Sequence, residues 1–244
     1  MQSSNNAVVE WRDGQPFASN FQDVYFSSDN GLQETEYVFL QGNDLSNRWK
    51  KPYYNSFTIA ETGFGTGLNF LCATKLWLST APKKATLHFI SVEKYPLSLN
   101  DLTRALHCWP ELKELTEPLL ANYKNLLNGK NYLSFYNNRV RLSLLIGDAT
   151  MCFAKFSNSR NVQLIDAWFL DGFSPSKNPD MWQPALFAQM ASISNVETTF
   201  ATFSSASEVR RGLMMAGFEV KKQTGFGKKR EMLRGRFLGN ANET

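Results

Sequence analysis

The sequence contains little cysteine and histidine. Its three cysteines, Cys72, Cys108 and Cys152, are far apart in a chain of 244 residues, and the only histidines are His88 and His107. An odd, scattered set of cysteines argues against a disulfide framework and for a reducing compartment, so we predict a cytoplasmic protein. No spacing of cysteine and histidine resembles a metal site, so we expect no bound metal.

Long apolar runs are also missing. No stretch approaches the ~20 apolar residues that span a bilayer, so we expect no membrane partner. The first residues, "MQSSNNAVVEWRDGQ", lack the basic-then-apolar pattern of a signal peptide. The length and the hydrophobic fraction of 43% suit one large domain with a sizeable core.

Charge is unevenly distributed along the chain. Residues 208–236 carry nine basic and three acidic side chains, whereas the formal net charge of the whole chain is only +4. Such a segment is usually a solvated surface, although it also suits a polyanion such as nucleic acid. Charge alone favours the solvated surface.

Apolar segments of strand length alternate with segments of helical periodicity. This alternation predicts an α/β fold with a parallel sheet covered on both faces. One helix is expected to start with Ser207 as its N-cap and to end near Gly217. We expect strands at 56–61, 86–93, 140–148, 164–171, 198–204, 218–224 and 231–237, and helices after Gly67, around 99–106, around 182–191 and around 207–217.

The first four predicted strands each end in a carboxylate. Ligands of open parallel sheets bind outside the carboxyl ends of the strands. The fold would therefore gather these acids along one edge of the sheet: Glu61, Glu93, Asp148 and Asp171.

A glycine-rich turn, "ETGFGTGLN" at 61–69, follows the first of these strands. It is either a tight turn without a ligand or a place where the backbone approaches one closely. The dinucleotide fingerprint is G-x-G-x-x-G, but here the third glycine comes one place early, and Glu61 would repel a phosphate. S-adenosylmethionine carries an ammonium, a sulfonium and a ribose diol and has no phosphate. Carboxylates such as Glu61 and Glu93 suit these cationic and hydroxyl groups better than they suit the phosphates of a dinucleotide. The turn therefore favours S-adenosylmethionine.

A second polar and aromatic segment, "DGFSPSKNPDMW" at 171–182, follows the fourth strand. It combines an acceptor, aromatic faces and a rigid loop beside the expected methyl position. Alternatively, Pro175 and Pro179 only set turns, and Phe173 and Trp182 belong to the core. The density of polar and aromatic groups favours a substrate site.

These motifs resemble the methyltransferase domain of the MnmC family of bifunctional tRNA-modifying enzymes. The matching stretches span nearly the whole chain: 23–43, 60–71, 88–97, 168–182 and 225–235. The resemblance implies a class I (Rossmann-like) S-adenosylmethionine-dependent methyltransferase, with a mostly parallel sheet and a C-terminal antiparallel hairpin. We expect an N-terminal extension over 1–55, the methyltransferase domain over 56–238, and a tail or truncated linker over 239–244.

The same resemblance implies an activity. Members of the family methylate the aminomethyl group of 5-aminomethyl-2-thiouridine at the tRNA wobble position, giving 5-methylaminomethyl-2-thiouridine. The implied partner is the tRNA anticodon loop. Many members continue into an FAD-dependent oxidase domain, so FAD is expected only if such a domain is present in the full-length protein. Whether this chain is a stand-alone member or an excised domain stays open.

The resemblance also assigns roles to residues. Asp171 would face the substrate amine as the catalytic residue, and the segment 27–34 would help to cover the pocket. The cofactor set comprises Glu61, Gly63, Phe64, Gly65, Thr66, Gly67, Asn69, Glu93, Lys94, Asp148 and Ala149. The substrate set comprises Asp29, Asn30, Gly31, Phe173, Lys177, Asn178, Trp182, Lys228, Lys229 and Arg230. With tRNA as substrate, nucleic-acid binding becomes the favoured interpretation of the basic segment.

Two other functions remain as alternatives. One is a nicotinamide-dinucleotide-dependent oxidoreductase, which the glycine spacing and Glu61 disfavour. The other is a non-catalytic RNA-binding module on the same fold, which the presence of all four strand-end acids disfavours.

Overall fold

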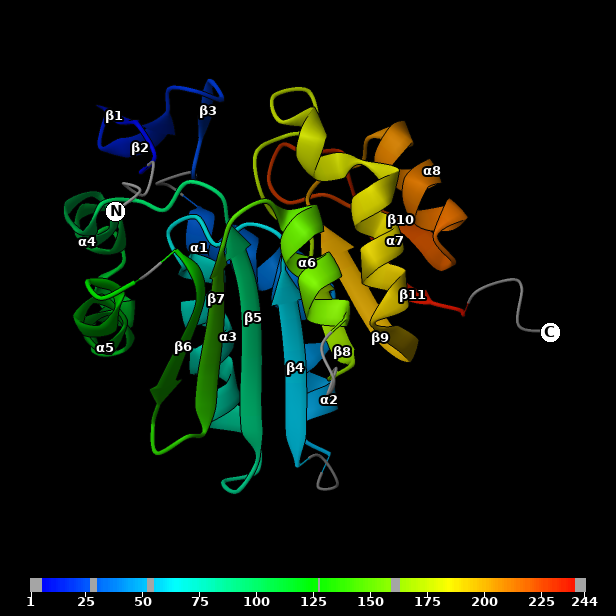
Figure 1. Ribbon diagram of the computed structural model, residues 1–244, viewed down its shortest axis with the longest axis horizontal. Coiled ribbons are helices and arrows are strands. Elements are labelled where there is room, and N and C mark those ends of the chain that lie inside the picture. Colours follow the sequence, from blue (N-terminus) through cyan, green and yellow to red (C-terminus); the bar gives the residue numbers. More distant parts are fainter. Residues whose placement is uncertain (1–5, 27–29, 52–54, 127, 159–162, 240–244) are drawn as a thin grey trace.

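An eight-stranded sheet forms the centre of the computed structural model, which describes residues 6–26, 30–51, 55–126, 128–158 and 163–239 (Figure 1). The strand order is β10-β11-β9-β8-β4-β5-β7-β6. Strands β9, β8, β4, β5 and β7 pair in parallel, whereas β11 is antiparallel to both of its neighbours and β6 is antiparallel to β7. The bounds are β4 Ser56–Glu61, β5 Thr86–Glu93, β6 Gly129–Phe135, β7 Val140–Ile146, β8 Ile165–Phe169, β9 Ser194–Thr202, β10 Phe218–Thr224 and β11 Glu231–Phe237.

Helices cover both faces of the sheet because successive side chains of a strand point to opposite faces. In β4, Phe57 and Ile59 are buried in one apolar cluster and Ala60 in the other. The first cluster contains side chains of α3 Leu68–Thr80, α4 Leu99–Leu106 and α5 Lys113–Tyr123, which follows the short 3₁₀ turn η2 Pro110–Leu112. The second contains side chains of α6 Ala149–Ser157, α7 Pro184–Ser192 and α8 Ser207–Met215.

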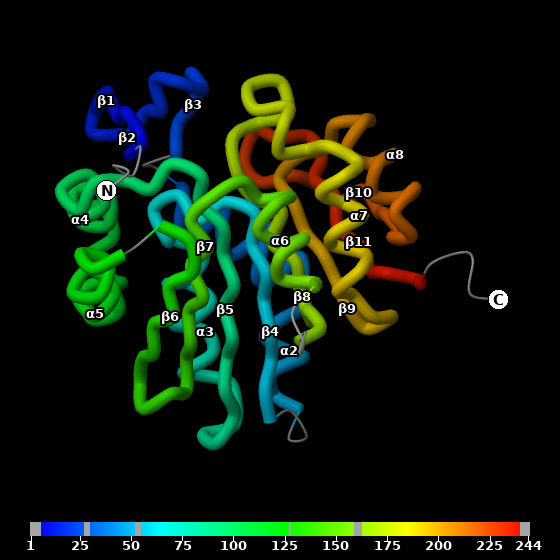
Figure 2. The backbone as a smooth tube through the Cα atoms, in the orientation of Figure 1, coloured from blue at the N-terminus to red at the C-terminus, as the bar shows by residue number. Residues whose placement is uncertain are grey.

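The N-terminal residues form a small sheet and then join the core. In Figure 2 the small sheet lies beyond the upper edge of the large one, above α4. The following helices pack against α3, where Trp49 is fully buried at right angles to Phe57 and Trp77. The elements are β1 Val9–Arg12, β2 Gln15–Ala18, β3 Asp23–Val24, α1 Gly31–Thr35, the π-helix η1 Glu36–Gln41 and α2 Leu45–Trp49.

The seven predicted strands and the C-terminal antiparallel hairpin are confirmed, with shifted ends. Strands β7 and β8 end two residues earlier than predicted, so Asp148 and Asp171 lie just beyond them. Strand β6, helices α5 and α6, and the elements before β4 were not predicted from the sequence. Gly217 follows the end of α8 with a φ of 91°, as expected.

The N-cap assigned to Ser207 was wrong. Ser207 is the first residue of α8, and Ala206 takes the N-cap position without a side-chain cap. The hydroxyl of Ser204 accepts a hydrogen bond from the Ala206 N–H at 3.4 Å. The serine that contacts the backbone before the helix is therefore Ser204 and not Ser207.

None of the described helices is both long enough and apolar enough to cross a membrane.

Candidate active site

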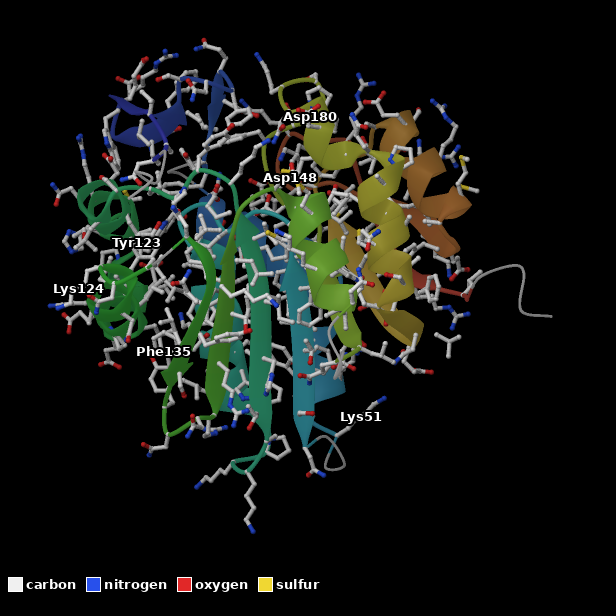
Figure 3. The ribbon with its side chains drawn as sticks, viewed as in Figure 1. Lys51, Tyr123, Lys124, Phe135, Asp148 and Asp180 are labelled. Carbon is white, nitrogen blue, oxygen red and sulfur yellow. The ribbon has the colours of Figure 1, made fainter. Side chains whose placement is uncertain are left out.

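A cavity of about 460 Å³ opens at the carboxyl edge of the parallel strands. Its size lies within the ~300–1,000 Å³ typical of small-molecule sites. Asp148 and Asp180 both line it, and Figure 3 shows both at this edge of the molecule, whereas Lys51 lies at the opposite end of the sheet. The described residues contain no group of three or more His, Cys, Asp or Glu side chains placed to hold a metal ion.

The glycine turn between β4 and α3 forms one wall of the cavity. Gly65 and Gly67 have φ values of 53° and 73°, a region that side-chain-bearing residues rarely adopt. Gly65 lines the cavity, and a Cβ built on it would lie 3.5 Å from Tyr25 Cδ1. A Cβ on Gly67 would lie only 2.8 Å from the Phe64 ring. Gly67 therefore allows the ring to pack, whereas Gly65 keeps the backbone open toward the cavity.

Glu93 fixes the turn from the end of β5. Its Oε2 accepts a hydrogen bond from the Gly65 N–H at 2.9 Å, and its Oε1 accepts one from the Tyr95 N–H at 2.8 Å. Burial raises the pKa of this carboxyl above its usual value, against the lowering effect of these backbone donors. Each carboxylate oxygen has two lone pairs, so the group can still accept a hydrogen bond from a ligand hydroxyl.

Asn69 connects two acids at the base of the cavity. Its Nδ2 donates to Glu61 Oε1 at 2.8 Å and to Asp171 Oδ2 at 2.6 Å, and its Oδ1 accepts from the Thr35 hydroxyl at 2.9 Å. Glu61 is fully buried, and its second oxygen accepts from the Ser91 hydroxyl at 2.6 Å. Burial and then the charge of Asp171 raise the pKa of Glu61 well above its usual value. Glu61 thus lies behind the cavity wall.

Asp171 presents its carboxylate at that wall. Its Oδ1 accepts from the Gly172 N–H at 2.8 Å, and its backbone is fixed by the hydroxyl of Thr62, which donates to the Asp171 carbonyl at 2.7 Å. Burial raises the pKa of Asp171 to about 6, although the Gly172 and Asn69 donors oppose the shift. A carboxyl with this pKa is mostly ionised at neutral pH and is a stronger base than an ordinary aspartate.

Residues in and beside β3 cover the loop that follows Asp171. The Phe173 ring stacks on Phe21 with centroids 4.6 Å apart, and the Tyr25 ring lies at 72° to it with centroids 5.2 Å apart. The Ser174 N–H donates to Asp23 Oδ2 at 3.2 Å. Two segments about 150 residues apart in sequence therefore build this side of the cavity together.

Trp182, in the 3₁₀ turn η3 Pro179–Trp182, packs in the core instead of facing the cavity. Its side chain is buried, and its Nε1–H donates to the Phe173 carbonyl at 2.9 Å. Its ring lies nearly perpendicular to that of Phe203. Trp182 therefore supports the loop that carries Phe173.

The turn of the β10–β11 hairpin borders the cavity through Lys229. The Lys229 Nζ lies 2.6 Å from Glu34 Oε1, and both residues line the cavity. Lys228 and Arg230 are exposed on either side, and within the described ranges neither has an ion pair. Basic side chains therefore rim the mouth of the cavity.

A family model described as S-adenosyl-L-methionine-dependent methyltransferase matches residues 110–237, which is more than half of the chain. The chain belongs to this methyltransferase family. The α/β architecture expected from the resemblance is confirmed, and so is the expectation of an enzyme.

Individual relatives support the assignment to the methyltransferases. A tRNA 5-methylaminomethyl-2-thiouridine biosynthesis bifunctional protein MnmC, from Methylobacillus flagellatus, is 53% identical over 236 residues, covering 97% of this chain and 36% of the relative. The protein of the same name from Chromobacterium violaceum is 51% identical over 232 residues, covering 95% and 34%. The resemblance to the MnmC family is confirmed, and the chain spans about a third of the length of these curated relatives.

A solved structure shares the fold. The crystal structure of MNMC2 from Aquifex aeolicus matches with a TM-score of 0.73 at 23% identity, covering 98% of this methyltransferase and 73% of that chain.

The cavity of this methyltransferase brings together most residues predicted from the sequence. The predicted residues that line it are Gly31, Gly63, Phe64, Gly65, Thr66, Asn69, Glu93, Lys94, Asp148, Ala149, Asp171, Phe173, Asn178 and Lys229. Outside its lining lie Asn30, Glu61, Gly67, Lys177, Trp182, Lys228 and Arg230. Asp29 and the rest of 27–29 fall outside the described residues.

Several lining residues of the methyltransferase were not predicted. They include Phe21, Asp23, Tyr25, Tyr95, Asp180, Met181 and Phe203. The N-terminal ones lie in the irregular first fifty residues, where periodicity gave no signal. Tyr25 lies within 23–43, one of the stretches that carry the resemblance, and Phe21 lies two residues before that stretch, so this nearness was the available signal.

Proposed function

We propose that this methyltransferase transfers a methyl group from S-adenosylmethionine to the primary amine of 5-aminomethyl-2-thiouridine at the tRNA wobble position. The observation that carries the proposal is the carboxylate of Asp171 at the cavity wall, hydrogen-bonded through Asn69 to the helix that follows the glycine turn. The names of the curated relatives refer to the biosynthesis of 5-methylaminomethyl-2-thiouridine in tRNA, and the 5-aminomethyl nucleoside is the amine that one methyl transfer converts into that product. Methyl transfer from labelled donor to tRNA that lacks only the final methyl tests it.

The residues present fit S-adenosylmethionine. Gly65 leaves space for a ligand to approach the backbone, and Glu93 suits the ribose hydroxyls. Asp148 caps α6 and lies 3.6 Å from Lys94, with Ala149 next to it at the cavity edge, where these side chains suit the adenine end. When bound, S-adenosylmethionine supplies a methyl group on a sulfonium centre that is a good leaving group.

The contribution of the chain to the reaction is mainly geometric. A neutral primary amine is already a good nucleophile, so its approach to the methyl group decides the rate. Asp171 accepts a hydrogen bond from the amine, orients its lone pair and takes or relays the proton that it loses. Asn69 holds Oδ2 of the Asp171 carboxylate, and the Gly172 N–H of the loop holds Oδ1.

The uracil ring must leave the stacked anticodon loop to reach this site, as it does in other enzymes that modify bases. We assign stacking on the uracil to Phe173, which lines the cavity and packs against Phe21, while Trp182 fixes the Phe173 backbone through its carbonyl. Lys228 and Arg230 then contact phosphates at the rim. A flavin-dependent oxidase domain, in the same chain or as a separate protein, would supply the amine, and the reaction would take place in the cytoplasm.

Glu93→Gln is expected to weaken S-adenosylmethionine binding. The amide keeps the shape but loses the charge that strengthens hydrogen bonds to the ribose, a loss of roughly 1–3 kcal/mol. In wild type the Gly65 and Tyr95 N–H groups bond to different oxygens of Glu93. In the variant only one side-chain oxygen remains for both donors, and this also contributes to the loss of affinity. Calorimetric titration measures the change, and an unaltered affinity would remove Glu93 from the cofactor set.

Lys228→Glu combined with Arg230→Glu is expected to raise the Kd for tRNA and to flatten its dependence on salt. Each phosphate that the variant no longer neutralises lowers the slope of log K against log salt by about 0.7–0.9. Affinity for S-adenosylmethionine should stay unchanged because neither side chain lines the cavity. Lys222→Glu combined with Arg211→Glu is the matched control on the same basic segment. Equal slopes in wild type and the rim variant would show that the rim is only solvated surface.

Titration with S-adenosylmethionine and with NADH separates the proposed function from its alternatives. We expect saturable heat with the first ligand and none with the second. Binding of NADH alone would support the oxidoreductase, and tRNA binding without either cofactor would support the RNA-binding module.

A further inference from the structure

One ion pair spans the cavity between distant parts of the chain. Lys229, on the β10–β11 turn, places its Nζ 2.6 Å from Oε1 of Glu34 in α1, although 195 positions separate them in sequence. The same Nζ lies 4.5 Å from the centroid of the Phe203 ring. All three residues line the cavity; the Glu34 side chain is 23% exposed and the Lys229 side chain is 47% exposed.

The group held there has the chemistry of the proposed substrate. The lysine side chain ends in a methylene and a primary ammonium, and so does an aminomethyl substituent on a uracil ring. A carboxylate on one side and an aromatic face on the other form a favourable environment for an alkylammonium ion. Lys229 therefore shows which ligand this part of the cavity accepts.

We propose that Glu34 and Phe203 form the receiving subsite for the primary ammonium of the substrate, and that Lys229 occupies this subsite until the substrate displaces it. The inference rests on the proposed function, because it assigns residues to that substrate. Glu34 is thus a specificity-determining residue, and Asp171 takes over the amine when it is neutral and ready to react.

The charges around the subsite favour a cation. Glu34 and Lys229 both act on the carboxyl of Asp171: the charge of Glu34 raises its pKa and that of Lys229 lowers it, so the three lie in one electrostatic environment. The charged residues of the cavity lining are Asp23, Glu34, Glu93, Asp148, Asp171 and Asp180 against Lys94 and Lys229.

This arrangement discriminates against a substituent that carries its own carboxylate. The N-carboxymethyl form of the same aminomethyl group would bring a negative charge next to Glu34 and Asp171. Displacement of Lys229 would then leave like charges facing each other in a partly desolvated site. The subsite therefore selects the free amine before any methyl transfer takes place.

Glu34→Gln tests the subsite because glutamine has nearly the same shape without the charge. We expect kcat/KM for tRNA carrying the aminomethyl group to fall by roughly 10- to 150-fold, the loss expected for a charged hydrogen-bond partner. We expect tRNA carrying the carboxymethylaminomethyl group to inhibit the variant at least as strongly as it inhibits wild type. If Glu34 had a purely structural role, the substitution would lower kcat/KM for the first tRNA and weaken inhibition by the second to the same degree.

Glu231→Gln is the matched control. Glu231 pairs with Lys222 at 2.7 Å on the same hairpin, and neither residue lines the cavity. The Glu231→Gln variant loses the same charge and the same kind of ion pair as Glu34→Gln, but away from the cavity. We therefore expect it to keep wild-type kcat/KM and wild-type inhibition. Melting temperature and S-adenosylmethionine affinity of both variants check that the fold and the cofactor site persist. Glu34→Asp, which keeps the charge, should recover part of the discrimination.

Lys229→Met gives a second test through the sign of its effect. The Lys229→Met variant lacks the ammonium that occupies the subsite. Its KM for aminomethyl-tRNA should be lower than the KM of the Lys228→Met variant, which loses the same charge one residue away. If Lys229 only binds phosphate, its variant will have a KM equal to or above that of Lys228→Met, and the inference is overturned.

The outcomes separate this inference from the function on which it rests. Wild type that binds S-adenosylmethionine but leaves aminomethyl-tRNA unmethylated would overturn both. Active wild type together with a Glu34→Gln variant that matches Glu231→Gln in kcat/KM and in inhibition would overturn the subsite alone.

Discussion

Replacing Asp171 with asparagine is expected to lower turnover by about 10²–10⁴-fold, the range typical of a lost general base. The variant keeps the shape of the side chain but loses the charge and the ability to accept a proton. S-adenosylmethionine affinity should change little, because the role that we propose for Asp171 is toward the substrate amine and not toward the cofactor. The deficit should shrink at higher pH, where more of the free amine is already neutral.

The pH profile of wild type adds a second signature. With a pKa of about 6, Asp171 gains its charge between roughly pH 5 and 7, so the rate should rise through that window. The Asp171→Asn variant should lack this limb and show only the rise due to the amine. Single-turnover rates between pH 5 and 9 measure both profiles.

The stability of the variant serves as a control with a defined sign. Burial raises the pKa of Asp171 from 3.8 to about 6, so ionisation destabilises the folded wild type as pH rises through that interval. Asparagine avoids this cost but offers one oxygen to the two donors, Asn69 and Gly172. The melting temperature of the variant minus that of wild type should therefore be larger at pH 7 than at pH 4.

Two results would change the role of Asp171. A variant that binds S-adenosylmethionine and methylates at the wild-type rate at neutral pH would exclude it from positioning and proton transfer. A variant that no longer binds S-adenosylmethionine would move Asp171 into the cofactor set.

Replacing Gly65 with valine is expected to abolish binding of S-adenosylmethionine. The φ of 53° disfavours a β-branched residue, and the isopropyl group would extend into the cavity beside Tyr25, where we propose that the cofactor approaches the backbone. Calorimetry should show no saturable heat at concentrations that saturate wild type.

Gly227→Val separates this steric effect from backbone strain. Gly227 has a similar φ of 57°, a Cβ there would meet nothing within 4 Å, and the residue does not line the cavity. Strain of this kind costs about 1–3 kcal/mol in either variant. If both variants bind S-adenosylmethionine equally well, the glycine turn is not where the cofactor lies.

Local sequence patterns could predict the elements that carry the site. The four strand-end acids and the glycine turn are each adjacent in sequence to an apolar strand, and a parallel sheet brings strand ends together by its geometry alone. The exact ends of β7 and β8 and the cap of α8 were beyond such patterns, because hydrogen bonds in loops decide them. Ser204, for example, accepts a hydrogen bond from the Ala206 N–H, and Ser207 already belongs to α8.

Contacts between distant segments could not be predicted in this way. Asn69 reaches Asp171 across 102 positions, and Glu34 meets Lys229 across 195. Neither pair has a periodicity or a spacing that marks it. From the sequence, the basic hairpin turn could be assigned only a general role in binding nucleic acid, whereas in the structure the half-exposed Lys229 lines the cavity and pairs with Glu34.

The most direct test of the account uses S-adenosylmethionine labelled in its methyl group and two tRNAs that differ only in the aminomethyl group of the wobble 2-thiouridine. After digestion to nucleosides, we expect label only from the tRNA that carries the amine, and only in 5-methylaminomethyl-2-thiouridine. Label in both tRNAs, label in another nucleoside, or no transfer by protein that binds S-adenosylmethionine would contradict the assignment of the primary amine as the methyl acceptor.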